Sequence, residues 1–167
     1  MNYNQNQRLN QFDENILIIG VDVSKKFHVA RAQDYRGVEF KRGIKFDNSR
    51  QGFAEFKEWK NSLQVENHKS KVLVGMEPTG PYWLPFARWL QMEGYWTVTV
   101  NPAHVKKSKE LDDNNQAKTD YRDAKVIAQL LKDARFSEPN LLEGVYEELR
   151  NAKNIRKIMV NDLKRIK

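Results

Sequence analysis

The chain has 167 residues, of which 40% are hydrophobic and 11% aromatic, and its formal net charge is +7. This length and composition suit one domain with a single hydrophobic core. Cysteine is absent, which excludes disulfides, thiolate metal sites and cysteine nucleophiles. No stretch resembles a signal peptide or is long enough to cross a membrane, so we expect a cytoplasmic protein with no membrane partner.

The first fifteen residues are polar and rich in Asn and Gln, which predicts a disordered leader over 1–15. An almost unbroken apolar run follows over Ile16–Val23, interrupted by Asp22. Such a run is typical of a strand covered on both faces in the middle of a sheet. A carboxylate near its end needs a cation, a cluster of donors or an open cleft. A capping or salt-bridged aspartate is the alternative interpretation.

The rest of the chain alternates strand and helix patterns, and residues 101–119 are polar, Lys-rich and without a clear period. Three strands, then helix, strand, helix, strand and helix predict an α/β domain with a mixed five-stranded sheet and helices on both faces. Right-handed crossovers make the fourth and fifth strands parallel to the first, which is the ribonuclease H-like order. After the first strand, the predicted elements are strands over 27–33 and 38–46, a helix over 49–66, a strand over 71–76, a helix over 81–94, a strand over 95–100, a helix over 121–136 and a helix from 142 onward.

Four acidic residues occupy positions that this order brings together. Asp22 lies at the carboxyl end of the first strand, and Glu77 immediately follows the fourth, which is predicted to be its parallel neighbour. Ligands of open α/β sheets bind at the edge formed by the carboxyl ends of the strands. Asp120 and Asp123 are three residues apart at the start of a helix and share one face. Four carboxylates without clustered histidines predict a site for a hard cation, Mg²⁺ or Mn²⁺.

Each acid also has a simpler interpretation. Asp120 and Asp123 favour the helix macrodipole from the first turn, and Glu77 fits an ordinary loop before a proline. Asp112 and Asp113 have a similar composition, but no apolar helix starts behind them, so we do not expect them to bind metal.

The sequence contains four separated segments that occur together in a known family: Gly20-Val21-Asp22-Val23-Ser24-Lys25, Glu77-Pro78-Thr79-Gly80 with Tyr82-Trp83, Asn101-Pro102, and Lys118-Thr119-Asp120-Tyr121-Arg122-Asp123-Ala124. It is similar to the N-terminal DEDD domain of IS110-family transposases, which resemble the Piv invertases, over about residues 16–136. The resemblance implies a RuvC-like domain in which the acids of the DEDD set are Asp22, Glu77, Asp120 and Asp123.

The family resemblance also implies an activity and partners. Its members are recombinases guided by a structured bridge RNA, and a serine in their C-terminal domain is believed to attack DNA. We therefore expect Mg²⁺-dependent DNA cleavage and transfer by a catalytic domain over 16–140, a coiled-coil helix beginning at 141, and a serine domain outside this chain. The residues expected to contact DNA or RNA are Lys25, Lys118, Arg122, Arg150, Lys153, Lys157 and Lys164.

The C-terminal helix is basic and carries an apolar seam. Seven of the 29 Lys and Arg residues lie in 149–167, against one acidic residue. Such a run is a reasonable phosphate-binding surface, although a solvated helix face is its commoner explanation. The seam predicts a homo-oligomer through helix pairing, with folding back onto the sheet as the alternative. The seam positions are Leu142, Val145, Leu149, Ala152, Arg156, Met159, Leu163 and Ile166.

Other functions remain open on the sequence. A stand-alone RuvC-like junction or RNA nuclease would use the same acids with water as nucleophile, and a non-catalytic nucleic-acid-binding module would not need them. A sugar-kinase or actin-like ATPase is disfavoured, because no glycine occurs between the first strand and Gly37. Five aromatic residues could stack on bases, but we expect most of them to pack in the core or against a partner. They are Tyr82, Trp83, Trp89, Tyr95 and Trp96.

Overall fold

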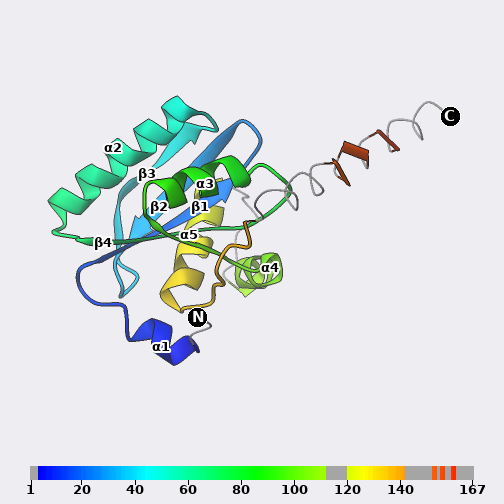
Figure 1. The fold of residues 1–167 in the computed structure, drawn as a ribbon. Coiled ribbons are helices and arrows are strands. Elements are labelled where there is room, and N and C mark those ends of the chain that lie inside the picture. The colour runs from blue at the N-terminus through cyan, green and yellow to red at the C-terminus, as the bar shows by residue number, and fades with distance from the viewer. Residues whose placement is uncertain (1–3, 112–119, 142–151, 154, 157–158, 161–167) are drawn as a thin grey trace.

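The domain is built on a mixed sheet of five strands in the order β3-β2-β1-β4-β5 (Figure 1). β2 is antiparallel to β1 and β3, whereas β4 is parallel to β1 and β5. This is the ribonuclease H-like order predicted from the sequence. The strands are β1 (Ile16–Val23), β2 (Phe27–Gln33), β3 (Glu39–Asp47), β4 (Lys71–Met76) and β5 (Trp96–Thr99). The computed structural model describes residues 4–111, 120–141, 152–153, 155–156 and 159–160.

Helices cover both faces of the sheet. Along β1, Leu17 and Ile19 pack in one core cluster, whereas Ile16 and Ile18 pack in the other. The first cluster takes its helical residues from α2 (Arg50–Glu66) and α3 (Leu84–Met92), and the second from α4 (Pro102–Leu111) and α5 (Asp120–Lys132). Burial on two faces explains the unbroken apolar sequence of β1.

Local signals set the start and end of these helices. The Ser49 side chain accepts a hydrogen bond from Gly52 N at 3.2 Å and caps α2, as predicted. The helix predicted from Pro81 begins three residues later, at Leu84, after a turn. Gly94 follows α3 with φ +76°, the left-handed conformation that ends helices.

One prediction about local order was wrong, and one helix was not predicted. Part of the predicted disordered leader forms helix α1 (Gln5–Leu9), because Arg8 donates to the carbonyl of Phe136 and Phe12 packs against Trp96. The polar segment after β5 contains α4, which the sequence did not show because Val105 is its one buried residue.

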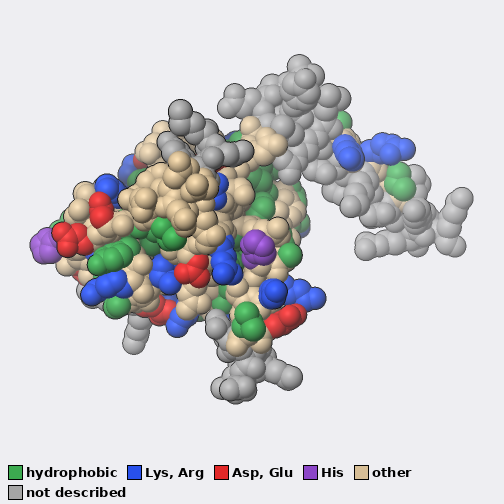
Figure 2. Space-filling model, turned by 90° about the horizontal axis from the view of Figure 1, so that it is seen from below, with side chains coloured by type: hydrophobic (Ala, Val, Ile, Leu, Met, Phe, Trp, Pro, Cys, Tyr) green, Lys and Arg blue, Asp and Glu red, His purple; other side chains and the backbone are tan. Residues whose placement is uncertain are grey.

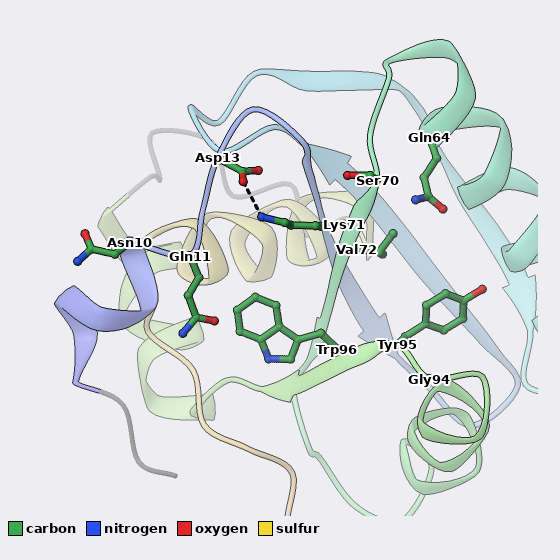
Figure 3. A pocket seen from close by; sticks show the side chains of 10 residues that line it. All are labelled: Asn10, Gln11, Asp13, Gln64, Ser70, Lys71, Val72, Gly94, Tyr95 and Trp96. Atoms are coloured by element: carbon green, nitrogen blue, oxygen red, sulfur yellow. Dashed lines mark hydrogen bonds and ion pairs between the residues drawn. The ribbon is translucent and has the colours of Figure 1, made fainter.

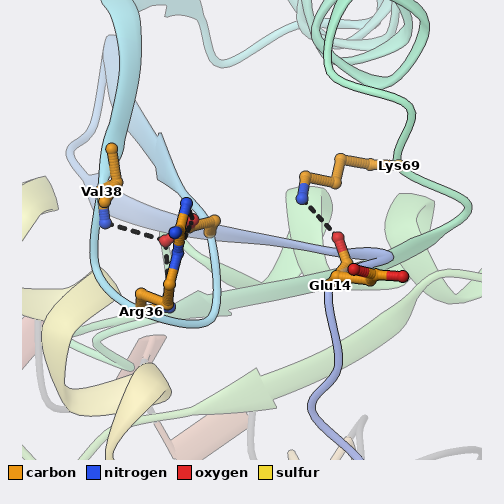
Figure 4. A network of polar contacts seen from close by, with 5 residues as sticks. Glu14, Arg36, Val38 and Lys69 are labelled. Atoms are coloured by element: carbon orange, nitrogen blue, oxygen red, sulfur yellow. Dashed lines mark hydrogen bonds and ion pairs between the residues drawn. The ribbon is translucent and has the colours of Figure 1, made fainter.

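A tight turn joins β2 to β3 and is fixed by a buried carboxylate (Figure 4). The Asp34 side chain accepts hydrogen bonds from the backbone N–H groups of Arg36 and Val38, each at 2.9 Å. Beside this turn, the Lys69 ammonium donates to the carbonyl of Glu14 and ties the start of β1 to the α2–β4 connection. This end of the sheet is therefore ordered by side chains as well as by strand pairing.

The described residues of the C-terminal segment are helical and exposed, and Figure 1 places them away from the sheet. Of the predicted seam, Ala152, Arg156 and Met159 belong to them, and the other seam positions lie outside the described residues. Within the described part of the chain, no helix is long and apolar enough to cross a membrane.

Candidate metal and nucleic-acid site

Asp22 and Glu77 extend from the same edge of the sheet. β1 and β4 run parallel with Val21 opposite Met76, so the two acids occupy the next position on each strand line. Side chains alternate along a strand, which puts Asp22 on the same face as Ile18 and away from the α2 and α3 face. The sequence prediction that this edge gathers acidic side chains therefore agrees with the topology.

Helix α5 lies unusually close to these two strands. Gly20 and Gly75 are partners in the β1–β4 register, and α5 rests on both. A Cβ on Gly20 would lie 2.3 Å from the carbonyl oxygen of Ala124, and one on Gly75 would lie 2.4 Å from Cδ2 of Leu131. The absence of side chains at the glycine pair lets the helix backbone approach β1. Its first turn is thereby brought to the edge that carries Asp22.

That first turn supplies the other two acids. Asp123 is 7% exposed, whereas Asp120 is exposed to solvent. Burial, with the nearby carboxylates of Asp123 and then Asp120, raises the pKa of Asp22 to about 6, and Glu77 adds a smaller effect in the same direction. The other three predicted acids therefore all contribute to the electrostatic environment of Asp22.

A lysine that the sequence did not predict lies among these acids. Lys109 Nζ is 2.7 Å from Asp123 Oδ2, and its positive charge opposes the rise in the pKa of Asp22. The sequence pattern that could have predicted the helix carrying Lys109 is the start of α4. Asn101 Oδ1 accepts from Ala103 N at 2.9 Å, with Pro102 as the first helical residue.

Glu77 is held by the turn that follows β4. Its Oε1 accepts a hydrogen bond from the Thr79 hydroxyl at 2.7 Å, and its carbonyl accepts from Thr79 N at 2.8 Å. Gly80 adopts φ +62°, which favours glycine there. The Glu-Pro-Thr-Gly segment is thus a turn that orients a carboxylate.

The donor chemistry of these acids fits a hard divalent cation. The carboxylates of Asp123, Asp120 and Glu77 repel that of the partly buried Asp22, so a cation would be favourable here, and oxygen ligands suit Mg²⁺ or Mn²⁺. Among the described residues, however, no three acidic or histidine side chains are close enough together to hold a metal ion. Carboxylate donors therefore lie near this edge of the sheet, but the described residues do not form a single metal-ligand shell.

The predicted nucleic-acid contacts are placed unevenly. Lys25 is exposed just after β1, on the edge that carries Asp22, and Lys153 is exposed on the C-terminal helix. Arg122 is half-buried on α5. The face drawn in Figure 2 mixes Lys and Arg with Asp and Glu side chains. The other predicted contacts, Lys118, Arg150, Lys157 and Lys164, lie outside the described residues.

A separate hollow of about 580 Å³ lies at the opposite edge of the sheet (Figure 3). It is lined by the Asp13–Lys71 ion pair, whose atoms are 2.5 Å apart, and by the Tyr95 and Trp96 side chains. None of the four acids lines this hollow.

Most of the aromatic residues that follow β4 are structural, as predicted. Trp83 is 3% exposed, and Trp89 and Tyr95 pack against the core under α2 and α3. Trp96 packs against the other core cluster, whereas Tyr82 is 40% exposed. Among these five aromatic residues, Tyr82 is therefore the main candidate for base stacking.

Comparison with known families decides the relationship. The model of the IS110-type DEDD transposases, described as Transposase, matches residues 19–167. The chain belongs to this transposase family. The match includes all four acids predicted from the sequence. A comparison with curated proteins gave no match.

Three solved structures similar to this IS110-family chain have low sequence identity to it. RuvC of T. thermophilus, in complex with a Holliday junction substrate, is 13% identical with a TM-score of 0.46, over 72% of this chain and 95% of RuvC. A ROK family transcriptional regulator, a homologue of E. coli MLC, is 9% identical with a TM-score of 0.41, over 58% of this chain and 31% of the regulator. The ethanolamine utilization protein EutJ from Carboxydothermus hydrogenoformans is 16% identical with a TM-score of 0.39, over 66% of this chain and 50% of EutJ.

Proposed function

We propose that this member of the transposase family carries out Mg²⁺- or Mn²⁺-dependent DNA strand cleavage and transfer, and that Asp22, Glu77, Asp120 and Asp123 hold the metal. The observation that carries the proposal is the partly buried Asp22, whose pKa is raised by burial and by the other three acids on the same face. Acidic residues with only a structural role would be expected to lie apart from one another or to pair with cations, because uncompensated like charges are unfavourable.

The acids approach the proposed metal position from two sides. Asp22 and Glu77 extend from the rigid sheet, and Asp120 and Asp123 from the first turn of α5. Thr79 holds one oxygen of Glu77, and the glycine pair fixes the helix against the strands. When bound, divalent ions would neutralise the scissile phosphate and stabilise the attacking and leaving oxygens. Asp22 must lose its proton before it can act as a ligand.

DNA is the proposed substrate and a structured guide RNA the proposed second partner, both on the basis of the family resemblance. Lys25 supports the nucleic-acid part, because an exposed cation beside the acidic edge can contact a phosphate. The exposed apolar side chains of Ile155 and Met159 on the C-terminal helix support self-association there.

The test combines Mn²⁺ binding by this chain, measured by titration calorimetry, with cleavage of supercoiled DNA when the serine-containing domain implied by the family resemblance is supplied. Asp22→Asn, Glu77→Gln and Asp123→Asn are each expected to lose most Mn²⁺ binding and all metal-dependent cleavage. Asp133→Asn is the matched control, because Asp133 lies just beyond the other end of α5 and pairs with Lys132. Full retention of function by Asp22→Asn would instead support a non-catalytic nucleic-acid-binding module.

A further inference from the structure

A cation of the protein already pairs with one of the proposed metal ligands. The Lys109 ammonium is 2.7 Å from Asp123 Oδ2, with the lysine side chain 32% and the aspartate side chain 10% exposed. Since Asp123 is one of the proposed metal ligands, its oxygen cannot bind the ammonium and coordinate a divalent ion equally well at the same time.

The placement of Lys109 is a consequence of how α4 packs. Val105 is 1% exposed and lies in the same core cluster as Val126 and Ile127 of α5. Lys109 is four residues after Val105, so both side chains are on the face of α4 that meets α5. Lys106 and Lys107, on the same helix, are exposed.

The charge of Lys109 also reaches beyond its direct partner. It is the cation that counteracts the effect of the acidic neighbours on Asp22. A nearly buried Asp123 without a cation would be costly, because removing one partner of a buried pair leaves an uncompensated charge. The lysine therefore performs, in the metal-free protein, the charge compensation that a divalent ion would provide.

We propose that Lys109 is an exchangeable counter-ion of the acidic site, which neutralises Asp123 before metal binding and is displaced from it when a divalent cation binds. This inference rests on the proposed function, since it assumes that Asp123 is a metal ligand. It assigns to α4 a role in setting the metal affinity. The displaced ammonium, on its long flexible stem, stays at the same edge of the sheet.

The first test is a Mn²⁺ titration of the full chain by calorimetry and by electron paramagnetic resonance of free Mn²⁺. Lys109→Met keeps most of the apolar stem and removes the charge, and should lower the Kd about five- to tenfold. Lys109→Arg, which retains the ion pair, and Lys106→Met, which removes an exposed charge from the same helix, should stay close to wild type. Without metal, Lys109→Met should melt at a lower temperature than Lys106→Met, and Mn²⁺ should raise its melting temperature more.

The second test measures the exchange directly. Acetylation by an N-hydroxysuccinimide ester, followed by mass spectrometry, should modify Lys109 several-fold faster with Mn²⁺ than without it, while Lys106 stays constant. In Asp123→Asn the fast rate should be present without metal.

The possible failures are distinguishable. If Asp22→Asn binds Mn²⁺ as wild type does, or wild type binds none, both the metal site and the exchange are wrong. If Asp22→Asn abolishes binding but Lys109→Met and Lys106→Met have equal affinities and Lys109 reactivity does not change with Mn²⁺, the exchange alone is overturned.

Discussion

Gly20 on β1 lies directly against Ala128 on α5, and a Cβ at Gly20 would lie 2.3 Å from the Ala128 amide nitrogen. We predict that Gly20→Ala lowers the free energy of unfolding by at least about 1–3 kcal/mol, because the new methyl meets helix backbone that cannot rotate away. The same shift of α5 should weaken Mn²⁺ binding. Urea denaturation and calorimetry measure the two effects.

Gly75→Ala is the matched comparison, because its methyl would meet the Leu131 side chain instead of backbone. The double variant Gly75→Ala with Leu131→Ala should be more stable than the sum of the single effects predicts, since the truncated leucine makes room. No side-chain truncation can compensate Gly20→Ala in this way, because its methyl would meet backbone atoms of α5. Equal stability of Gly20→Ala and wild type would show that α5 is not seated on this strand as closely as described.

The acidic edge should make stability depend on pH. Burial and then the neighbouring acids raise the pKa of Asp22 from 3.8 to about 6, so the folded state binds this proton more tightly than the unfolded state. Stability from this group is therefore present below pH 4 and is lost as the pH rises through 6. At about 1.36 kcal/mol per pKa unit the loss is at most about 3 kcal/mol, and solvent screening of this partly exposed group reduces it.

Asp22→Asn should remove that dependence. In metal-free buffer the variant is expected to be more stable than wild type at pH 8 and to show a flatter stability profile between pH 4 and 7. Asp47→Asn, an exposed acid at the end of β3, serves as the control. A wild-type profile that does not fall between pH 4 and 7 relative to Asp22→Asn would contradict the burial of a charged carboxylate here.

The strand order and the positions of the four acids could be predicted from local sequence. The lysine that lies among these acids could not. The apolar run of β1 and the position of Glu77 after β4 were sufficient to predict a common edge, because strand alternation and parallel pairing fix the geometry. The ion pair of Lys109 with Asp123 depends on the packing of α4 against α5. That helix buries Val105 and little else, so no apolar period revealed it.

Long-range contacts also explain the order of the predicted leader. Its composition is polar, but Phe12 packs against Trp96 and Phe136, and Arg8 lies over the Phe136 ring at 4.8 Å from the ring centre. Composition alone gives no sign of such partners more than eighty residues away. The arrangement of metal ligands could not be predicted from sequence either, because side-chain rotamers and a bound cation decide whether the four carboxylates converge.

Thr79 should affect metal binding through Glu77. Its hydroxyl donates to Glu77 Oε1 at 2.7 Å, which orients the carboxylate without contacting a metal. Thr79→Val keeps the shape but removes the donor, and we expect about a tenfold loss of Mn²⁺ affinity, the lower range for such supporting hydrogen bonds. Thr79→Ser should retain near-normal affinity. Equal binding by the Val and Ser variants would show that the hydroxyl does not orient Glu77.

The last prediction concerns a buried lysine far from the acids. Lys60 on α2 is 4% exposed, and its ammonium donates to Gln64 Oε1 at 2.7 Å and lies 4.8 Å from the centre of the Tyr95 ring. The nearby carboxylate of Glu93 is bound by Lys57. Burial, and then the charge of Lys57, lower the pKa of Lys60, so its protonated form costs stability at neutral pH.

Lys60→Met should therefore stabilise the domain by about 1 kcal/mol at pH 7, because an apolar side chain of similar length replaces a buried charge that lacks a full partner. A lowered pKa means that the unfolded state binds this proton more tightly, so the wild type recovers stability as the pH rises from the folded pKa toward that of the unfolded state. The advantage of Lys60→Met should accordingly shrink toward pH 10, and Mn²⁺ affinity should not change. Urea denaturation at pH 7 and pH 10 checks the first statement and calorimetry the second. A loss of stability at pH 7 would mean that the contacts of the ammonium with Gln64 and Tyr95 outweigh its burial.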